Sequence, residues 1–237
     1  MKRVLNVIRL QLINRQTYLW VPLIVLGGSF AISLLIYAII RPSVVGEADG
    51  VPFPIYGGGS QAPLWYFLFV GVQAMTMTFP FSQALSITRR DFFLGTMLTA
   101  IGTSVLLAIL FVLGGLAELA TGGWWMNGYF FHLPWIWEDG PFGAGVVYFT
   151  VALFFFVVGF TFATIFKTWG MVALTLSWMG VALLLVGLVF LITRLELWMS
   201  VWIGITDLGA LGLALWGLVV IAVMAVVSLV AFRRTVP

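Results

Sequence analysis

Apolar stretches of about 20 residues, separated by segments of varied length and polarity, make up most of the chain. None of these stretches contains Asp, Glu, Lys, Arg or His, and each is long enough for an α-helix to cross a bilayer. The pattern predicts six spanning helices, at about residues 19–40, 64–85, 94–117, 143–165, 169–192 and 208–231. We therefore expect an all-α polytopic membrane protein in which residues 1–237 form a single transmembrane domain.

The overall composition agrees with this pattern. Hydrophobic residues make up 62% of the chain and charged residues only 8%, whereas a water-soluble domain has about a quarter of its residues charged. The chain has no cysteine and a single histidine, His132, which excludes disulfides, thiolate metal sites and sites built on paired histidines. The net charge of +3 comes from scattered cations and not from a basic stripe, so no nucleic-acid partner is expected.

The charged residues between the apolar stretches predict the orientation, because Lys and Arg near span ends favour the cytoplasmic side. With both termini in the cytoplasm, only Arg41 and Arg194 of the 11 basic residues lie outside. The cytoplasmic ones are Lys2, Arg3, Arg9, Arg15, Arg89, Arg90, Lys167, Arg233 and Arg234. Seven of the 8 acidic residues then fall outside, and Asp91 alone is inside.

The leader, residues 1–18, has the spacing of an amphipathic helix on the inner membrane surface. Its apolar stripe is formed by Leu5, Ile8, Leu12 and Leu19, and its polar face by Lys2, Arg9 and Gln16. Val7, Leu10 and Ile13 fall on the polar side. They either contact a protein partner, or the segment is a simple anchoring leader.

The turn between the second and third spans reads SITRRDFFLG, from Ser86 to Gly95. Thr88 followed at the third position by Asp91 is typical of a capped helix start, so a short cytoplasmic helix is expected here. Its Arg89 and Arg90 carry donors suited to carboxylates on a partner, and Phe92 and Phe93 offer apolar anchors. The alternative is that the two arginines only stop translocation.

Three further segments are expected on the outer side. Residues 121–141 gather Trp, Tyr and Phe, which prefer the headgroup zone, so this loop either anchors the protein in the outer interface or forms a substrate portal. Residues 194–207 are too short to span and too apolar for an open loop, which predicts a re-entrant or interfacial segment before the last span. Residues 42–63 form an extended loop to which the sequence assigns no role.

Polar side chains inside the spans are amides and hydroxyls. Gln73, Thr76, Thr99 and Thr103 are the candidates for lining a pathway, and the alternative is that they form hydrogen bonds between helices. Pro80 removes an amide donor within the second span and is expected to kink it.

The sequence lacks the residues that several kinds of enzyme and carrier need. A P-loop needs a lysine before Ser or Thr at the end of a glycine-rich loop, and neither Lys2 nor Lys167 has that context. His132 alone supplies neither a catalytic triad nor a zinc site. The chain is therefore expected to be no enzyme and to bind no cofactor or metal itself. The spans also lack the carboxylates of proton-coupled carriers, whereas a sodium-coupled carrier stays open.

This layout resembles the membrane subunit of ABC-2 type ATP-binding-cassette transporters. The resemblance in topology covers the whole chain, and the local one covers Ser86–Gly95. It implies that Thr88, Arg89, Arg90, Asp91 and Phe92 form the ATPase-coupling helix, that residues 1–18 form a connecting helix and that residues 194–207 form the re-entrant element. It also implies two copies of a separate ATPase that binds ATP and Mg²⁺, a second permease chain, identical or different, and a place in the cell membrane, in particular a prokaryotic cytoplasmic membrane.

The function expected from the sequence is thus a permease subunit that exports a hydrophobic or amphiphilic substrate. One alternative is an ATP-independent secondary carrier. The other is a membrane anchor or assembly subunit without a transport pathway.

Overall fold

A computed structural model describes residues 2–13, 16–44 and 53–233, with only the backbone described at residues 2, 3, 41–44 and 233. Predictions for Arg15, Arg234, Glu47 and Asp49 lie outside the described residues. The elements are α1 (Lys2–Ile13), η1 (Gln16–Trp20), α2 (Val21–Val44), β1 (Ile55–Tyr56), η2 (Gly58–Ser60), α3 (Gln61–Gln73), η3 (Ala74–Thr78), α4 (Phe79–Ala84), α5 (Arg89–Thr121), η4 (Gly123–Asn127), β2 (Gly128–Tyr129), α6 (Gly140–Arg194) and α7 (Trp198–Arg233).

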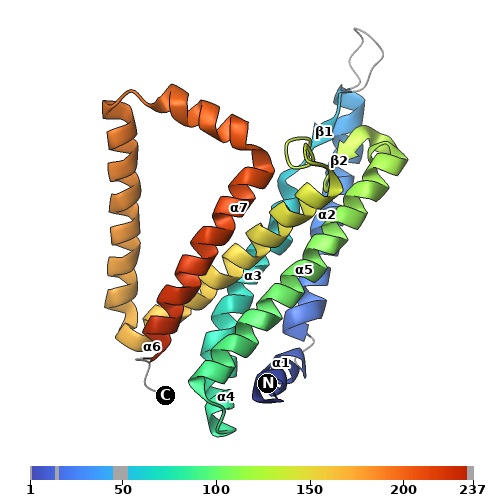
Figure 1. The fold of residues 1–237 in the computed structure, drawn as a ribbon. Helices are drawn as coiled ribbons and strands as arrows, with labels where there is room; N and C mark the ends of the chain where they lie inside the picture. The colour runs from blue at the N-terminus through green and yellow to red at the C-terminus, as the bar shows by residue number, and fades with distance from the viewer. Residues whose placement is uncertain (1, 14–15, 45–52, 234–237) are drawn as a thin grey trace.

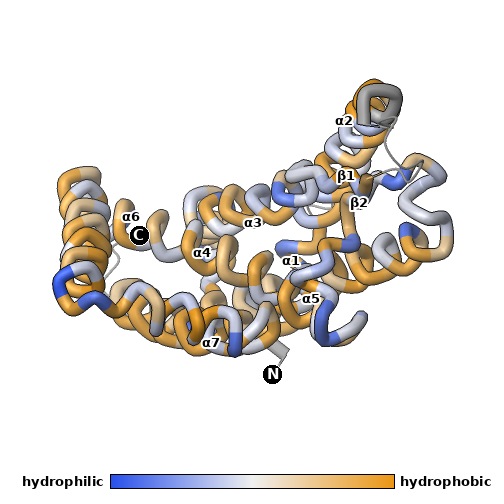
Figure 2. Tube along the Cα trace, turned by 90° about the horizontal axis from the view of Figure 1, so that it is seen from above, coloured by the Kyte–Doolittle hydropathy of each residue, from blue (hydrophilic) through white to orange (hydrophobic). Residues whose placement is uncertain are grey.

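The chain folds as long apolar helices, as the sequence predicts (Figure 1). Within the described residues, five helical stretches are long and apolar enough to cross a membrane: Gln16–Ile40, Gly58–Ala84, Arg89–Thr121, Gly140–Arg194 and Trp198–Phe232. In Figure 2 the helices are largely orange, and the hydrophilic positions gather at turns and helix ends. These observations support a membrane protein.

Helix α6 covers two of the predicted spans because it bends sharply at Gly170. This residue has φ 79° and ψ −174°, a backbone conformation that residues with a side chain rarely adopt. Figure 1 shows the two arms of α6 diverging from this bend. The arm after the bend is apolar and lies apart from the other helices, with Val172 72% and Leu183 69% exposed.

Helix α7 has a comparable bend at Gly209, where φ is 61°. The segment before the bend, Trp198–Leu208, runs across the top of Figure 1, and the remainder of α7 descends beside the first arm of α6. A short apolar helix therefore occupies most of the predicted non-spanning segment, residues 194–207. Its re-entrant placement in a membrane stays a prediction.

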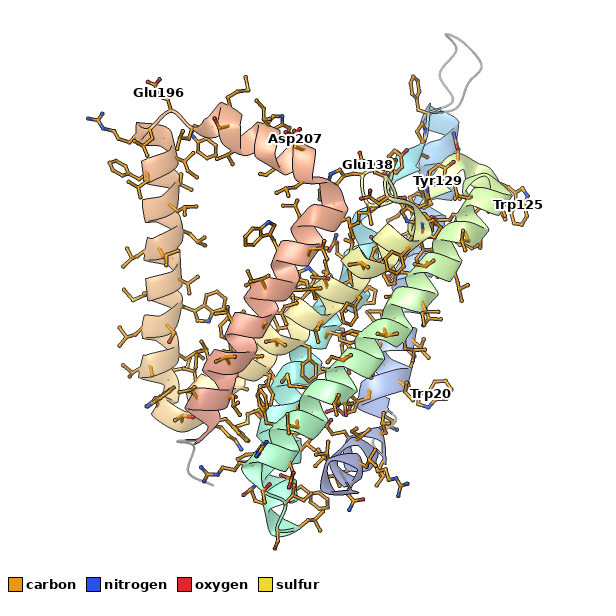
Figure 3. The ribbon with its side chains drawn as sticks, in the orientation of Figure 1. Trp20, Trp125, Tyr129, Glu138, Glu196 and Asp207 are labelled. Atoms are coloured by element: carbon orange, nitrogen blue, oxygen red, sulfur yellow. The ribbon has the colours of Figure 1, made fainter. Side chains whose placement is uncertain are left out.

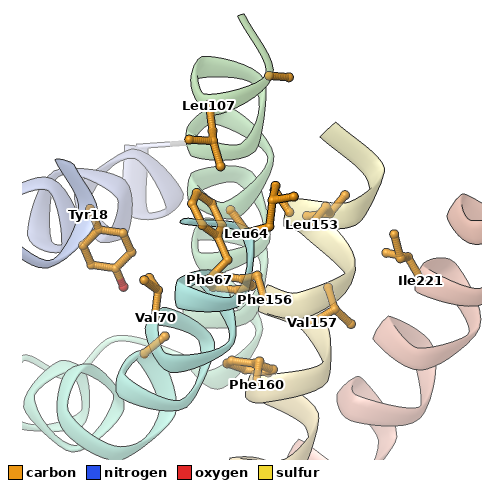
Figure 4. Close-up of a cluster of buried hydrophobic side chains, with 14 of the residues drawn as sticks. Tyr18, Leu64, Phe67, Val70, Leu107, Leu153, Phe156, Val157, Phe160 and Ile221 are labelled. Carbon is orange, nitrogen blue, oxygen red and sulfur yellow. The ribbon is translucent and has the colours of Figure 1, made fainter. Parts of the chain in front are cut away.

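The core lies where α3, α5 and the first arm of α6 meet. Figure 4 shows Phe67 of α3, Leu107 of α5, and Phe156 and Phe160 of α6 in one cluster of buried side chains.

Two glycines let α3 and α6 approach closely. A Cβ added at Gly71 would collide with the backbone of Phe156 in α6, and one at Gly159 would collide with the backbone of Leu68 in α3. Small residues commonly serve this purpose between membrane helices, because attraction there depends on close packing.

The charged side chains that the structure describes lie towards two opposite ends of the molecule. Helix α1, the start of α5 and the last turn of α7 lie together at one end, which we name the α1 end (Figure 1). Figure 3 places Glu138, Glu196 and Asp207 at the other end. This separation agrees with the predicted distribution of cations and acids, whereas the assignment of the ends to cytoplasm and exterior stays a prediction.

Candidate functional site at the start of helix α5

The turn that the sequence singles out is the beginning of α5. Thr88 has extended backbone angles, φ −69° and ψ 148°, and its Oγ1 accepts a hydrogen bond of 3.2 Å from the Asp91 amide. The same hydroxyl donates to Asp91 Oδ2 over 2.7 Å. The predicted helix start at Thr88 is therefore confirmed.

The separate short coupling helix is not present in this structure. The helix that Thr88 caps begins at Arg89, continues through Gly95 and ends only at Thr121, with a length of 33 residues. The physical reason is that no residue near the start of the predicted span at residue 94 breaks a helix. No proline lies between Asp91 and Leu94, and Gly95 itself is helical. The predicted coupling residues thus form the first turn of a spanning-length helix.

Phe92 and Phe93 point into the protein, so they are not exposed anchors for a partner in this structure. Phe92 is fully buried, and Phe93 is 5% exposed. The Phe92 ring lies 5.3 Å from that of Phe79 in α4, measured between ring centroids, and 6.1 Å from that of Phe232 in α7. Phe93 lies 5.9 Å from Phe160 in α6. This phenylalanine cluster joins the first turn of α5 to three other helices.

Helix α1 lies across the bundle and packs on α5 (Figure 1). Val7 is fully buried, and a Cβ added at Gly95 would lie 2.5 Å from the Val7 Cβ. One turn further on, Gln11 donates a buried hydrogen bond of 2.7 Å to the Thr96 hydroxyl. Val7 therefore packs on α5 of the same chain, whereas Ile13 is 77% exposed. Contact of this face with a protein partner stays a prediction.

The contact between Val7 and Gly95 can be tested by adding one methyl group. Gly95→Ala is expected to loosen α1 and to speed up tryptic cleavage after the exposed Arg9 about tenfold, if the crowding costs about 1.4 kcal/mol. Gly102→Ala, two turns along the same helix, adds its methyl group to open space and is the matched control. Equal cleavage rates in both variants would show that α1 does not depend on this contact.

Two hollows flank Arg90. The first, of about 520 Å³, lies between α1 and α5 and is lined by Val4, Leu5, Ile8, Arg90, Asp91, Leu94 and Leu98. The second, of about 460 Å³, lies between α5 and α7 and is lined by Arg89, Arg90, Phe93, Leu94, Leu229 and Phe232. Arg90 is exposed, and Arg89 and Asp91 are partly exposed. We call the first turn of α5 with these two hollows the α5 corner.

The predicted pathway residues lie on α3, η3 and α5, and the three threonines donate their hydroxyl hydrogens to carbonyls one turn earlier in the chain. Thr76 donates to the Val72 carbonyl over 3.0 Å, Thr99 to that of Gly95 over 3.0 Å, and Thr103 to that of Thr99 over 2.9 Å. Gln73, at the end of α3, is partly exposed. Each of these bonds lies within one helical stretch, so none of them is a bond between helices of the kind that the alternative predicts. A polar pathway through these residues stays a prediction.

A buried carboxylate at the opposite end was missed by reasoning from the sequence. Glu118 lies in the last turn of α5 and is fully buried. Its oxygens accept four hydrogen bonds of 2.7 to 2.8 Å, from the indole of Trp124 and from the amides of Phe130, Phe131 and His132. An acid close to a span end, followed by a loop rich in glycine and aromatic residues, was the available signal.

The aromatic segment 121–141 is therefore folded into the end of the bundle instead of lying wholly on its surface. Phe130 is fully buried and Trp137 is 7% exposed, whereas Trp125 is 75% exposed and labelled at the periphery in Figure 3. The Phe131 carbonyl accepts hydrogen bonds from the Trp137 indole and the Tyr148 hydroxyl. Within this segment, Trp125 and Trp135, which is 49% exposed, keep the exposure that a membrane anchor needs.

Comparisons with protein-family models, with curated proteins and with solved structures found no match to this chain. Among the described residues, no group of three or more His, Cys, Asp or Glu side chains is placed to hold a metal ion.

Proposed function

We propose that this chain is the permease subunit of an ABC-2 type transporter and that the α5 corner receives a separate ATPase. The observation that carries the proposal is the form of this corner. Charged side chains of Arg90 and Asp91 line an accessible hollow, while Phe92, one residue on, is buried against other helices. A protein that docks there can move the spans.

The proposed transmission runs through the phenylalanine cluster. A displacement of the first turn of α5 carries Phe92 and Phe93 with it, because both rings are enclosed. Phe232 touches this cluster from α7, with centroids 4.7 Å from Phe79 and 6.4 Å from Phe93. ATP-driven closure of the partner would therefore tilt α5 and α7 together instead of bending one turn.

The proposal has six spans, one more than the five long helical stretches, because α6 bends at Gly170 and α7 bends at Gly209. The two arms of α6 count as separate crossings, and Trp198–Leu208 lies at the outer surface or dips into it. The arm of α6 after Gly170 is the surface that we assign to the second permease chain, because its apolar side chains have few contacts within the chain. Both termini and the α5 corner then face the cytoplasm.

The proposed substrate is hydrophobic or amphiphilic and is exported. A hollow of about 400 Å³ between α5 and the first arm of α6 supports this, since its lining is almost wholly apolar. It includes Val105, Ile109, Val112, Phe142 and Phe149.

Charge reversal at the α5 corner tests the proposal. Arg89→Glu combined with Arg90→Glu is expected to leave the amount of protein in the membrane unchanged and to lower co-purification of the ATPase at least tenfold, because attraction to the partner becomes repulsion. Arg194→Glu, at the other end of the molecule, is the control. Undiminished ATPase binding and transport in the double variant would refute the docking role.

An ATP-independent carrier is the competing function, and Glu118 is the observation that favours it, since a buried carboxylate is what an ion-coupled carrier uses. The four donors that hold Glu118 favour a fixed structural role instead. Transport by the purified chain alone, driven by an imposed ion gradient, would support the carrier and exclude the need for an ATPase.

A further inference from the structure

The hollow of about 400 Å³ between α5 and the first arm of α6 has an apolar lining, and we call it the α5–α6 hollow. The two helices run side by side (Figure 1). Every residue that the structure places in the lining is Val, Ile, Leu, Ala, Gly, Pro or Phe, from positions 105–113 of α5 and 141–149 of α6. None of these side chains carries a hydrogen-bonding group. A ligand of this hollow is therefore held by packing.

Small residues form the inner part of the hollow, and larger ones form its rim. Ala108 of α5 is buried, and Gly145 of α6 has no Cβ. A Cβ built there would lie 3.4 Å from Val112 Cγ2, which is ordinary contact, so this position has room for a ligand atom. Ile109 and Phe142 are exposed. The hollow therefore opens on an outer face of the bundle, where helices of spanning length meet hydrocarbon.

The length of the hollow matches one leaflet of a bilayer. Its lining covers residues 105–113 and 141–149, and each of these runs rises about 12 Å at 1.5 Å per residue. Half of the hydrocarbon core is about 15 Å thick. Val105 lies midway along α5, and Pro141 lies in the first turn of α6, shortly after the exposed Asp139. In a bilayer, the hollow therefore reaches from near the headgroups to near the midplane.

We propose that the α5–α6 hollow binds one acyl chain of a phospholipid from the leaflet at the end opposite to α1. An acyl chain needs no hydrogen-bond partner, and dispersion contacts with the floor and the rim hold it in place. A peptide in the same position would leave its backbone donors and acceptors unpaired, which is costly in an apolar site. The headgroup stays at the membrane boundary near Pro141.

This site deepens the proposed function, because a phospholipid held here would be the exported amphiphile. The identification of the lipid as the substrate rests on the proposed function. Binding of the acyl chain requires only that α5 and the first arm of α6 cross a bilayer.

Photolabelling of the purified chain in phosphatidylcholine vesicles tests the site. The probe is a trace of phosphatidylcholine that carries a diazirine on its palmitoyl chain, and mass spectrometry of peptides locates the label. A diazirine close to the ester is expected to label the segment around Phe142, and one close to the chain end to label the segment around Val105. The yield at both places should be about threefold that on the exposed arm of α6 after Gly170, because the hollow adds packing contacts.

Filling the hollow separates a built site from general contact with lipid. Gly145→Leu is expected to lower the yield of both segments to that of the exposed arm of α6. Gly28→Leu adds the same side chain to open space on α2 and is the matched control. Elution as a single species confirms the fold of each variant. Val112→Phe fills the hollow from α5 and gives the same test if Gly145→Leu does not fold.

Three results would overturn the assignment. The first is a yield in the hollow that equals the yield on the exposed arm of α6, or that neither filling variant lowers. The second is loss of the label when a small mole fraction of palmitic acid is added, which would show a fatty-acid site. The third is an unlabelled hollow in a dimer that Gly145→Leu dissociates, which would show that a second copy of the chain occupies it.

Because the vesicles contain only the purified chain and lipid, the result is independent of the transporter proposal. Loss of ATPase binding after charge reversal at the α5 corner, with no specific label in the hollow, would support the permease and remove this site. Undiminished ATPase binding and transport after charge reversal, together with a label that Gly145→Leu abolishes, would do the reverse.

Discussion

Replacing Glu118 with glutamine is expected to destabilise the protein by about 3 kcal/mol or more. The carboxylate accepts four hydrogen bonds from N–H groups in a fully buried position. Glutamine has one acceptor oxygen, and its NH₂ group would face two donors of the same kind. Hydrogen bonds to charged groups contribute about 1.5–3 kcal/mol each, and unpaired buried donors add their own penalty.

Glu118→Gln should lower the midpoint of thermal unfolding in detergent, measured by tryptophan fluorescence. Glu118→Leu should lower this midpoint further. Glu138→Gln is the matched control, because Glu138 is exposed at the same end of the molecule. A Glu118→Gln midpoint within error of the control would mean that segment 130–132 is not held by this carboxylate.

Replacing Gly159 with alanine is expected to push α3 and α6 apart, with a loss of about 3 kcal/mol, the upper part of the usual range for overpacking. The added methyl group meets the Leu68 carbonyl group and Cα, which are backbone atoms that cannot rotate away. Gly71→Ala should act in the same way, because its methyl group meets the backbone of Phe156.

The control for Gly159→Ala lies in the same helix. Gly180 in the second arm of α6 has open space where its Cβ would be, so Gly180→Ala should stay within about 0.5 kcal/mol of the unmodified chain. Urea or thermal unfolding in detergent compares the two. Equal stability of the variants would contradict the close helix contact.

The length and class of the helices could be predicted from the sequence, because hydrocarbon solvent demands long apolar stretches with internal hydrogen bonds. The start of α5 could also be predicted, since the cap from Thr88 to the Asp91 amide is local. Such features depend on neighbours a few residues away. They need no knowledge of the rest of the fold.

The direction of individual apolar side chains could not be predicted. Lipid and protein interior are both apolar, so composition does not distinguish Phe92, which is buried, from Leu94, which is 41% exposed. The rings that contact Phe92 are those of Phe79 and Phe232, and Phe232 is far away in sequence. Only the packing of α7 against α5 shows that Phe92 faces inward.

The role of Glu118 was missed for a related reason. An acid at the end of an apolar stretch normally faces water, and its four donors lie up to 14 residues later in a loop of unusual geometry. The connection between the predicted spans 143–165 and 169–192 also differs from the prediction. The structure has one helix, α6, in place of two helices joined by a short turn, and this helix bends at Gly170.

The transporter account depends on contact between the α5 corner and an ATPase, and crosslinking from the corner measures that contact most directly. The chain has no cysteine, so Arg90→Cys provides one attachment point for a photoreactive group in intact membranes, and Trp125→Cys provides an exposed one at the opposite end. The account predicts that position 90 crosslinks to a protein with a P-loop and that position 125 does not. Crosslinking of position 90 to lipid alone, or of both positions to the same ATPase equally, would contradict it.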